Sequence, residues 1–174
     1  MQKTDYPHLN ESLYSQLLPN GLRINVLPRP GFTKSFALFA TNYGGADRRF
    51  QLGGRWLDTP AGVAHFLEHK LFDMPDGNAF TSASMTAYHF ECTDRFTENL
   101  RTLLDFVSTP YFTPESVQKE QGIIGQEIRM VEDMPGHAVY YKLLRSLYKS
   151  NPVRDSVAGT VESIAEITSE VLYH

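Results

Sequence analysis

Cysteines, basic clusters and long apolar runs are scarce in this sequence, and each absence excludes a class of protein. A single cysteine, Cys92, in 174 residues allows neither an internal disulfide nor a CxxC metal site. Lysine and arginine are scattered, and a net charge of -4 provides no basic stripe for nucleic acid. The N-terminal residues lack the apolar segment of a secretory signal, and no apolar run has membrane-spanning length. We therefore expect a cytoplasmic protein that binds neither nucleic acid nor membrane.

The composition, 41% hydrophobic and 12% aromatic, is that of a globular protein, and it predicts one domain over residues 1–174. Two apolar runs flank Asn20-Gly21, a dipeptide that strongly favours a β-hairpin. The glycine-rich segment 44–58 is expected to be an irregular loop. The predicted strands are residues 13–18, 22–27, 34–43 and 82–92.

Helices are expected to fill most of the remaining chain. Thr59-Pro60 and Thr113-Pro114 each place an N-cap residue before a proline, which is tolerated at the first helical position. The predicted helices are residues 60–73, 95–108, 114–132 and 137–149. Strands followed by helices, with a further strand between them, indicate an α+β fold in which helices pack on one face of an antiparallel sheet.

The first predicted helix carries an HxxEH motif. His65, Glu68 and His69 fall on the side opposite its apolar residues. Imidazoles at positions i and i+4 lie one turn apart and can direct nitrogens at one ion, while the glutamate stands beside them near a bound water. This spacing is found among zinc-site motifs. The alternative is a metal-free helix with two solvated histidines and a solvated glutamate.

The helix predicted over 114–132 places two carboxylates, Glu120 and Glu127, in the middle of an apolar arc. That arc consists of Val117, Ile123, Ile124, Ile128 and Val131. An unpaired buried carboxylate costs several kcal/mol, and no lysine or arginine shares this arc. The alternative is that the Glu120 face is exposed.

A divalent ion would account for both helices. His65, His69 and Glu127 would bind it, and Glu120 would accept a hydrogen bond from the far nitrogen of a ligand histidine. Gly122 and Gly125, both poor helix formers, are expected where another element approaches the helix closely.

Three protein ligands leave a fourth position open, as catalytic zinc sites do. Zinc in such a site activates water and polarises a carbonyl, and Glu68 would take the proton of that water and pass it to the leaving amine. The residues therefore predict hydrolysis of a peptide bond.

These residues resemble a known family, the inverted-motif zinc peptidases that include pitrilysin, insulysin and the mitochondrial processing peptidase. Thr59-Pro-Ala-Gly-Val-Ala-His-Phe-Leu-Glu-His-Lys-Leu-Phe72 is similar to the zinc helix of that family, and Glu120-x6-Glu127 to its downstream acidic pair. Ala158-Gly-Thr-Val-Glu-Ser-Ile164 resembles its segment after the second zinc helix. The resemblance implies zinc bound by His65, His69 and Glu127, with Glu68 as the general base and Glu120 behind the ligands.

Asn78-Ala79-Phe80-Thr81, together with Thr86-Ala-Tyr88, resembles the substrate-side strand of the family. The resemblance implies that Asn78, Ala79 and Phe80 pair with an extended peptide by β-augmentation. Alternatively, Asn78 is a turn residue and Phe80 belongs to the core. The connection between His69 and Asn78 is shorter than relatives usually have, either naturally or because residues are absent from this chain.

Relatives build a clamshell from several such domains, so we expect an N-terminal catalytic portion that ends before its domain is complete. Further domains or a partner subunit would complete the clamshell around a peptide or small protein substrate. The leading hypothesis is a zinc-dependent endopeptidase domain. Alternatives are a non-catalytic subunit that binds peptides or supports an active partner, and a metal-free interaction domain.

Overall fold

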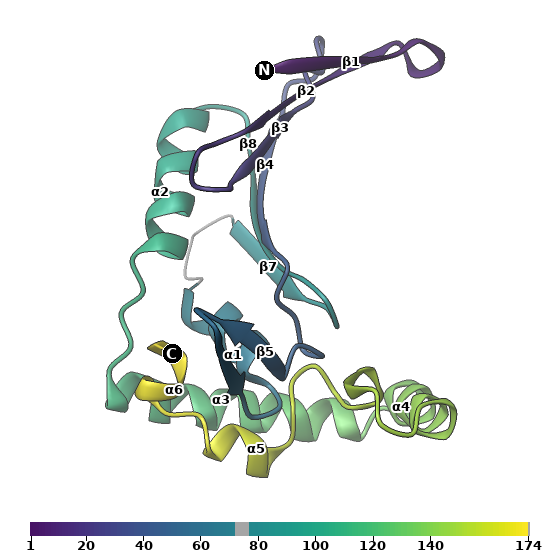
Figure 1. The fold of residues 1–174 in the computed structure, drawn as a ribbon, viewed down its shortest axis with the longest axis vertical. Helices are drawn as coiled ribbons and strands as arrows, with labels where there is room; N and C mark the ends of the chain where they lie inside the picture. The colour runs from purple at the N-terminus through teal and green to yellow at the C-terminus, as the bar shows by residue number, and fades with distance from the viewer. Residues whose placement is uncertain (72–76, 174) are drawn as a thin grey trace. The chain divides into compact units, whose positions relative to one another are not determined.

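The computed structural model describes residues 1–71 and 77–173, which form two compact units, Met1–Ser35 and Phe36–His174. Figure 1 shows helices together with antiparallel strands, which confirms the predicted α+β class. The expectation of one domain, incomplete at its C-terminus, stays a prediction. None of the helices in these residues is both long and apolar enough to cross a membrane.

The first unit is a three-stranded antiparallel sheet in the order β1-β2-β3. Its elements are β1 (Gln2–Tyr6), the 3-10 helix η1 (Pro7–Leu9), β2 (Glu11–Leu17) and β3 (Arg23–Val26). The predicted Asn-Gly hairpin is confirmed, since Asn20 Oδ1 accepts a hydrogen bond from Leu22 N at 3.1 Å and Gly21 has a φ of +88°. The sequence analysis missed β1.

The main sheet of the second unit has the order β4-β8-β7, which places β7 at an edge. Its strands are β4 (Ser35–Thr41), β7 (Gly77–Thr81) and β8 (Thr86–Cys92). β7 and β8 form an antiparallel hairpin whose last register pair is Thr81 opposite Thr86. β8 therefore begins four residues later than the strand predicted over 82–92. Residues 82–85 form a turn instead, in which Ser82 Oγ donates to Met85 O and accepts from Met85 N.

The segment expected to be an irregular loop, residues 44–58, instead contains a second hairpin. Its strands are β5 (Arg49–Leu52) and β6 (Arg55–Asp58), and they pair antiparallel. Gly53 and Gly54 connect them with φ values of +57° and +82°. Positive φ at both central residues is typical of a type I′ turn, which matches the natural twist of the two strands.

All four predicted helices are present, although the bounds of three of them differ, and the three short helices near the C-terminus were not predicted. They are α1 (Val63–Leu71), α2 (Phe96–Ser108), α3 (Pro114–Glu132), α4 (Pro135–Leu147), η2 (Pro152–Arg154), α5 (Val161–Ala165) and α6 (Ser169–Tyr173). α1 begins at Val63 rather than at Pro60, because Gly62 has a φ of +97° and so breaks the helical path. α4 begins at Pro135, two residues earlier than predicted, with its proline in the first turn. The predicted end of the first helix, residues 72–73, lies outside the described residues.

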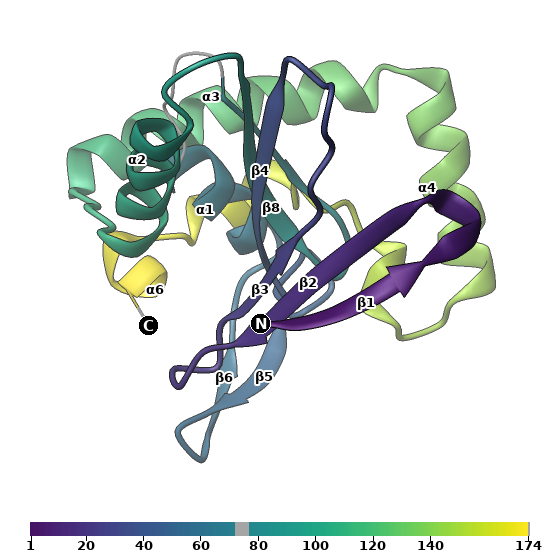
Figure 2. The same cartoon turned by 90° about the horizontal axis from the view of Figure 1, so that it is seen from above.

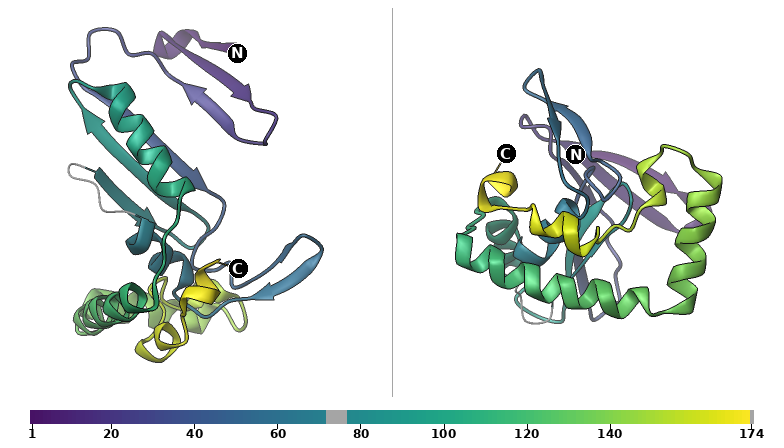
Figure 3. Two further views of the ribbon diagram at one scale, coloured as in Figure 1. Left: turned by 90° about the vertical axis from the view of Figure 1, so that its left-hand side faces the viewer. Right: turned by 90° about the horizontal axis from the view of Figure 1, so that it is seen from below.

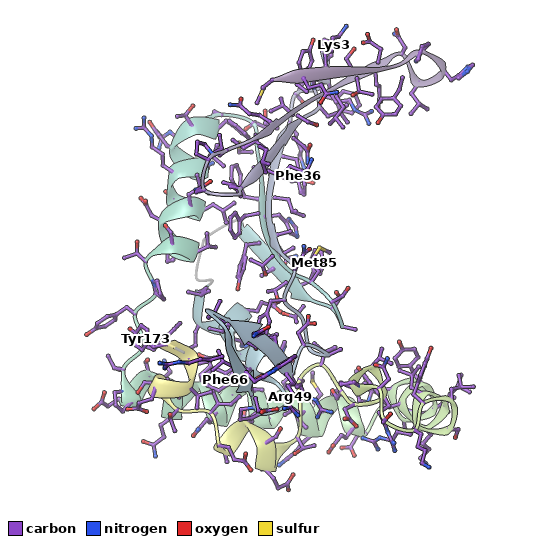
Figure 4. All side chains as sticks on the ribbon, viewed as in Figure 1. Lys3, Phe36, Arg49, Phe66, Met85 and Tyr173 are labelled. Atoms are coloured by element: carbon purple, nitrogen blue, oxygen red, sulfur yellow. The ribbon has the colours of Figure 1, made fainter. Side chains whose placement is uncertain are left out.

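Two apolar clusters hold this unit together. In the first, Phe66 of α1 is fully buried among residues of α3 and of the C-terminal helices, as Figure 4 illustrates. Its other buried members are Val63, Phe112, Val117, Ile124, Ile128, Ile164, Ile167 and Leu172. In the second, Leu103 of α2 packs on Tyr88 and Phe90 of β8, so α2 covers one face of the sheet (Figures 2 and 3).

The start of α1 is fixed by the segment that precedes α5. Ser163 Oγ donates a hydrogen bond to Ala61 O at 2.8 Å. A Cβ on Gly62 would lie 2.6 Å from Ala158 O, and a Cβ on Gly159 would lie 2.5 Å from Ala61 O. Two glycines are thus required for this backbone contact, which orients the histidine-bearing helix.

Candidate metal centre

α1 presents both histidines of the motif on one side. The His65 and His69 rings have centroids 4.6 Å apart and planes inclined at 68°. Their side chains are 12% and 23% exposed, while Val63, Ala64 and Phe66 on the other side of the helix are buried. The burial of one face therefore holds both imidazoles toward the same neighbouring element.

That neighbour is α3. Its start is fixed by a capping box, in which the Thr113 side chain accepts from Ser116 N and the Ser116 side chain accepts from Thr113 N, and Pro114 occupies the first turn. Burial of Val117, Ile124 and Ile128 turns Glu120 and Glu127, at a spacing of one heptad, toward α1.

The structure brings His65, His69 and Glu127 together. Glu127 Oε1 lies 3.6 Å from His65 Nε2, and Glu127 Oε2 lies 3.4 Å from His69 Nε2. One ligand atom from each residue falls within 4.8 Å of the other two. Two imidazole nitrogens and a carboxylate oxygen at this spacing are a donor set suited to zinc.

Glu120 lies behind the cluster. Its Oε1 is 3.1 Å from His69 Nδ1, and its side chain is 15% exposed. Such a contact fixes the tautomer in which the Nε2 of His69 carries the free lone pair. His65 Nδ1, in contrast, is a buried atom without a hydrogen-bond partner among the described residues.

Burial also affects the charge of the cluster. The pKa of His65 is lowered from 6.5 to about 4, mainly by burial and also by the nearby His69, while Glu120 opposes the shift. His65 is therefore a neutral imidazole at pH 7, the form that binds metals. Burial raises the pKa of Glu68, against the hydrogen bond from Thr81 and the charge of His69.

Glu68 projects from α1 toward the edge strand. Thr81 Oγ1, at the end of β7, donates a hydrogen bond to Glu68 Oε2 at 2.5 Å. A cavity of about 570 Å³ borders this carboxylate. Its lining consists of Glu68, His69, Lys70, Asn78, Ala79, Ser116, Lys119 and Glu120. The sequence analysis did not anticipate the contact with Thr81; strand alternation puts Ala79 and Thr81 on one face but does not show which helix that face meets.

The three residues predicted to pair with a peptide lie on β7. Asn78 and Ala79 reach the cavity, and Asn78 Oδ1 accepts a hydrogen bond from Ala79 N at 2.9 Å. Phe80 is 40% exposed, so the alternative that assigned it to the core is wrong. Pairing with substrate stays a prediction for all three residues.

Two expectations about α3 are wrong. Ile123, assigned to the apolar arc, is 45% exposed. The two glycines do not mark a close approach: a Cβ on Gly122 would contact nothing within 4 Å among the described residues, and a Cβ on Gly125 would lie 3.8 Å from Ile164. Ile164 of α5 thus packs on α3 at an ordinary distance.

This fold and this cluster indicate a protein that can hold a divalent metal ion. A family model described as insulinase, peptidase family M16, matches residues 75–161. A Bacillus subtilis protein named as an uncharacterized zinc protease, YmfH, is 47% identical over 97% of this chain and 43% of its own length. The chain therefore belongs to the insulinase family of peptidases, which confirms the resemblance seen in the sequence.

Solved structures show the same fold. A putative M16-like peptidase from Alicyclobacillus acidocaldarius has a TM-score of 0.90 and 41% identity, over 98% of this chain and 43% of that one. An inactive M16 domain from Pseudomonas fluorescens has a TM-score of 0.76 and 15% identity, over 92% of this chain and 42% of that one. The chain thus spans less than half the length of these relatives.

Proposed function

We propose that this chain is the zinc-binding, catalytic part of an endopeptidase. The observation that carries the proposal is the convergence of His65 and His69 from α1 with Glu127 from α3, whose ligand atoms lie within 4.8 Å of one another. Members of the family are named zinc proteases, which supports zinc as the ion.

Each residue would have a defined task. His65, His69 and Glu127 would hold zinc, which when bound would polarise the substrate carbonyl and acidify a water molecule. Glu120 would orient His69 through Nδ1. Glu68 would accept a proton from the attacking water at its carboxylate and deliver it to the leaving amine.

The edge strand β7 would bind the substrate backbone. A peptide that pairs with Asn78–Phe80 lies along the cavity that Glu68 and His69 border. A second domain or partner subunit would close over the peptide, because the relatives are more than twice as long as this chain. The cytoplasmic location expected from the single cysteine stays a prediction.

The competing proposal is a non-catalytic member of the family that binds peptides. The same fold occurs in an M16 domain described as inactive. The two proposals differ in whether Glu68 transfers a proton, since either protein could bind zinc and peptide.

The Glu68→Gln substitution tests the proposal, because glutamine keeps the shape of the side chain and cannot accept the proton. We expect the full-length gene product to bind about one zinc and hydrolyse peptides, and Glu68→Gln to keep the zinc but lose at least about a hundredfold in kcat. Glu132→Gln, on the exposed side of α3, is the matched control and should equal the parent. Absence of zinc from chelator-free protein, or equal turnover by Glu68→Gln, would contradict the proposal.

A further inference from the structure

The carboxylate of Glu68 is held by a residue outside the metal cluster. Thr81 Oγ1 donates a hydrogen bond to Glu68 Oε2 at 2.5 Å. The contact joins α1 to the last residue of β7, thirteen positions further along the chain. One carboxylate oxygen is therefore restrained, on a residue that lines the cavity.

Thr81 itself has little freedom to move. It is paired in register with Thr86, which is 3% exposed and donates from Oγ1 to Tyr43 O at 2.8 Å. The two threonine hydroxyl oxygens lie 3.5 Å apart. The backbone of Thr81 is thus placed by the sheet, independently of the hydrogen bond to Glu68.

The turn that follows Thr81 is also held by backbone hydrogen bonds. Gly45 N donates to Ser82 O at 2.9 Å, and Ala46 N donates to Ala83 O at 2.8 Å. A Cβ on Gly44 would lie 2.5 Å from Met85 N, so the two backbones are in direct contact. Figure 4 shows Met85 near this end of the hairpin. A donor anchored by its register and by its turn can fix a flexible acceptor.

We propose that Thr81 is the positioning residue for Glu68: its hydroxyl holds Oε2 so that Oε1 faces the water that attacks the peptide bond. The inference rests on the proposed function. A glutamate side chain has several rotatable bonds, and one fixed hydrogen bond removes rotamers in which the carboxylate would point away from the reacting atoms. Because Thr81 also ends the strand that would pair with substrate, base and peptide are placed by one element.

The alternative is that the bond only attaches β7 to α1. Two substitutions separate these roles. Thr81→Val keeps the shape and removes the hydroxyl, and Thr81→Ser keeps the hydroxyl. Thr102→Val is the control, because Thr102 on α2 donates to a backbone carbonyl, Glu98 O, far from the cluster in sequence.

In the full-length gene product loaded with zinc, we expect Thr81→Val to lower kcat about tenfold to a hundredfold, with zinc affinity and KM within about twofold of the parent. Thr81→Ser should restore most of the rate, and Thr102→Val should leave it unchanged. Urea unfolding of each variant verifies that it is folded. A raised KM with unchanged kcat would overturn the inference.

A second readout does not depend on activity. NMR coupling constants of the Glu68 side chain should report one rotamer in the parent and in Thr81→Ser, and an average of rotamers in Thr81→Val. One fixed rotamer in Thr81→Val would overturn the inference even if the parent hydrolyses peptides. Rotamer averaging in Thr81→Val, with no hydrolysis by any form, would support the positioning contact and reject the proposed function.

Discussion

Zinc affinity should fall in a defined order when the two glutamates of α3 are changed one at a time. The structure gives them different relations to the histidines. Glu127 lies within 3.6 Å of both Nε2 atoms, as a third ligand would, whereas Glu120 contacts only His69, through Nδ1 at 3.1 Å. Replacing either by glutamine keeps the volume of the side chain and removes its negative charge.

The expected losses follow from these contacts. Zinc binding by four protein ligands is worth about 10–16 kcal/mol, so one ligand accounts for about 3 kcal/mol, and Glu127→Gln should weaken binding about a hundredfold. Glu120→Gln keeps an acceptor for the His69 N–H and loses only the negative charge that strengthens this hydrogen bond. Replacing a residue that hydrogen-bonds to a metal ligand typically lowers metal affinity about 10- to 100-fold, and we expect a loss at the lower end, about tenfold.

Competition with a chromophoric chelator at fixed neutral pH measures these affinities. Glu132→Gln, exposed on the same helix, is the control and should bind zinc as the parent does. Equal affinity of Glu127→Gln and the parent would remove Glu127 from the ligands. A larger loss in Glu120→Gln than in Glu127→Gln would reverse the assignment of ligand and supporting residue.

Two further predictions concern stability. The pKa of His65 is lowered from 6.5 to about 4, mainly by burial, so between these pH values the unfolded chain binds a proton that the folded metal-free chain excludes. The contribution of His65 to stability is therefore complete above pH 6.5 and is lost as the pH falls toward 4. Urea unfolding should show that the free energy of unfolding decreases by up to about 3 kcal/mol over this range, and the decrease should be absent in His65→Gln. Gly62→Ala should destabilise by about 2 kcal/mol or more, since a positive φ and overlap with Ala158 O oppose a Cβ, whereas Gly122→Ala should stabilise slightly; equal denaturation midpoints for the two variants would contradict this reasoning.

The sequence was sufficient to predict the helices that carry the cluster, because their information is local. A Thr-Pro start and an apolar repeat define α3, and helical spacing alone puts His65 beside His69. The expectation that Glu120 and Glu127 need a cation rests on solvation, which also follows from sequence. Their proximity to the histidines in the structure agrees with it, while their roles as supporting residue and ligand stay predictions.

The features that were missed depend on residues far apart in the chain. The start of α1 is set by Gly62 against Ala158, and no pattern near Pro60 encodes that contact. β5 alternates Arg49, Phe50, Gln51 and Leu52, but β6 has Trp56 and Leu57 side by side, and both strands have only four residues, so the alternation is too short to indicate a hairpin. Thr81 meets Glu68 only once the register of β7 on β8 is known.

The chemistry of the proposed centre depends on a helix that is too short to be stable alone. α1 has nine residues, fewer than the roughly 12–15 that an isolated helix needs in water. Three separate contacts hold it: the 158–164 segment at its start, α3 along its histidine face, and Thr81 at Glu68. Because α1 carries both proposed histidine ligands and the proposed base, a change at its start would disturb metal binding and proton transfer together. Glu127→Gln and Thr81→Val each remove one lateral contact, and so they separate the loss of metal from the loss of base position.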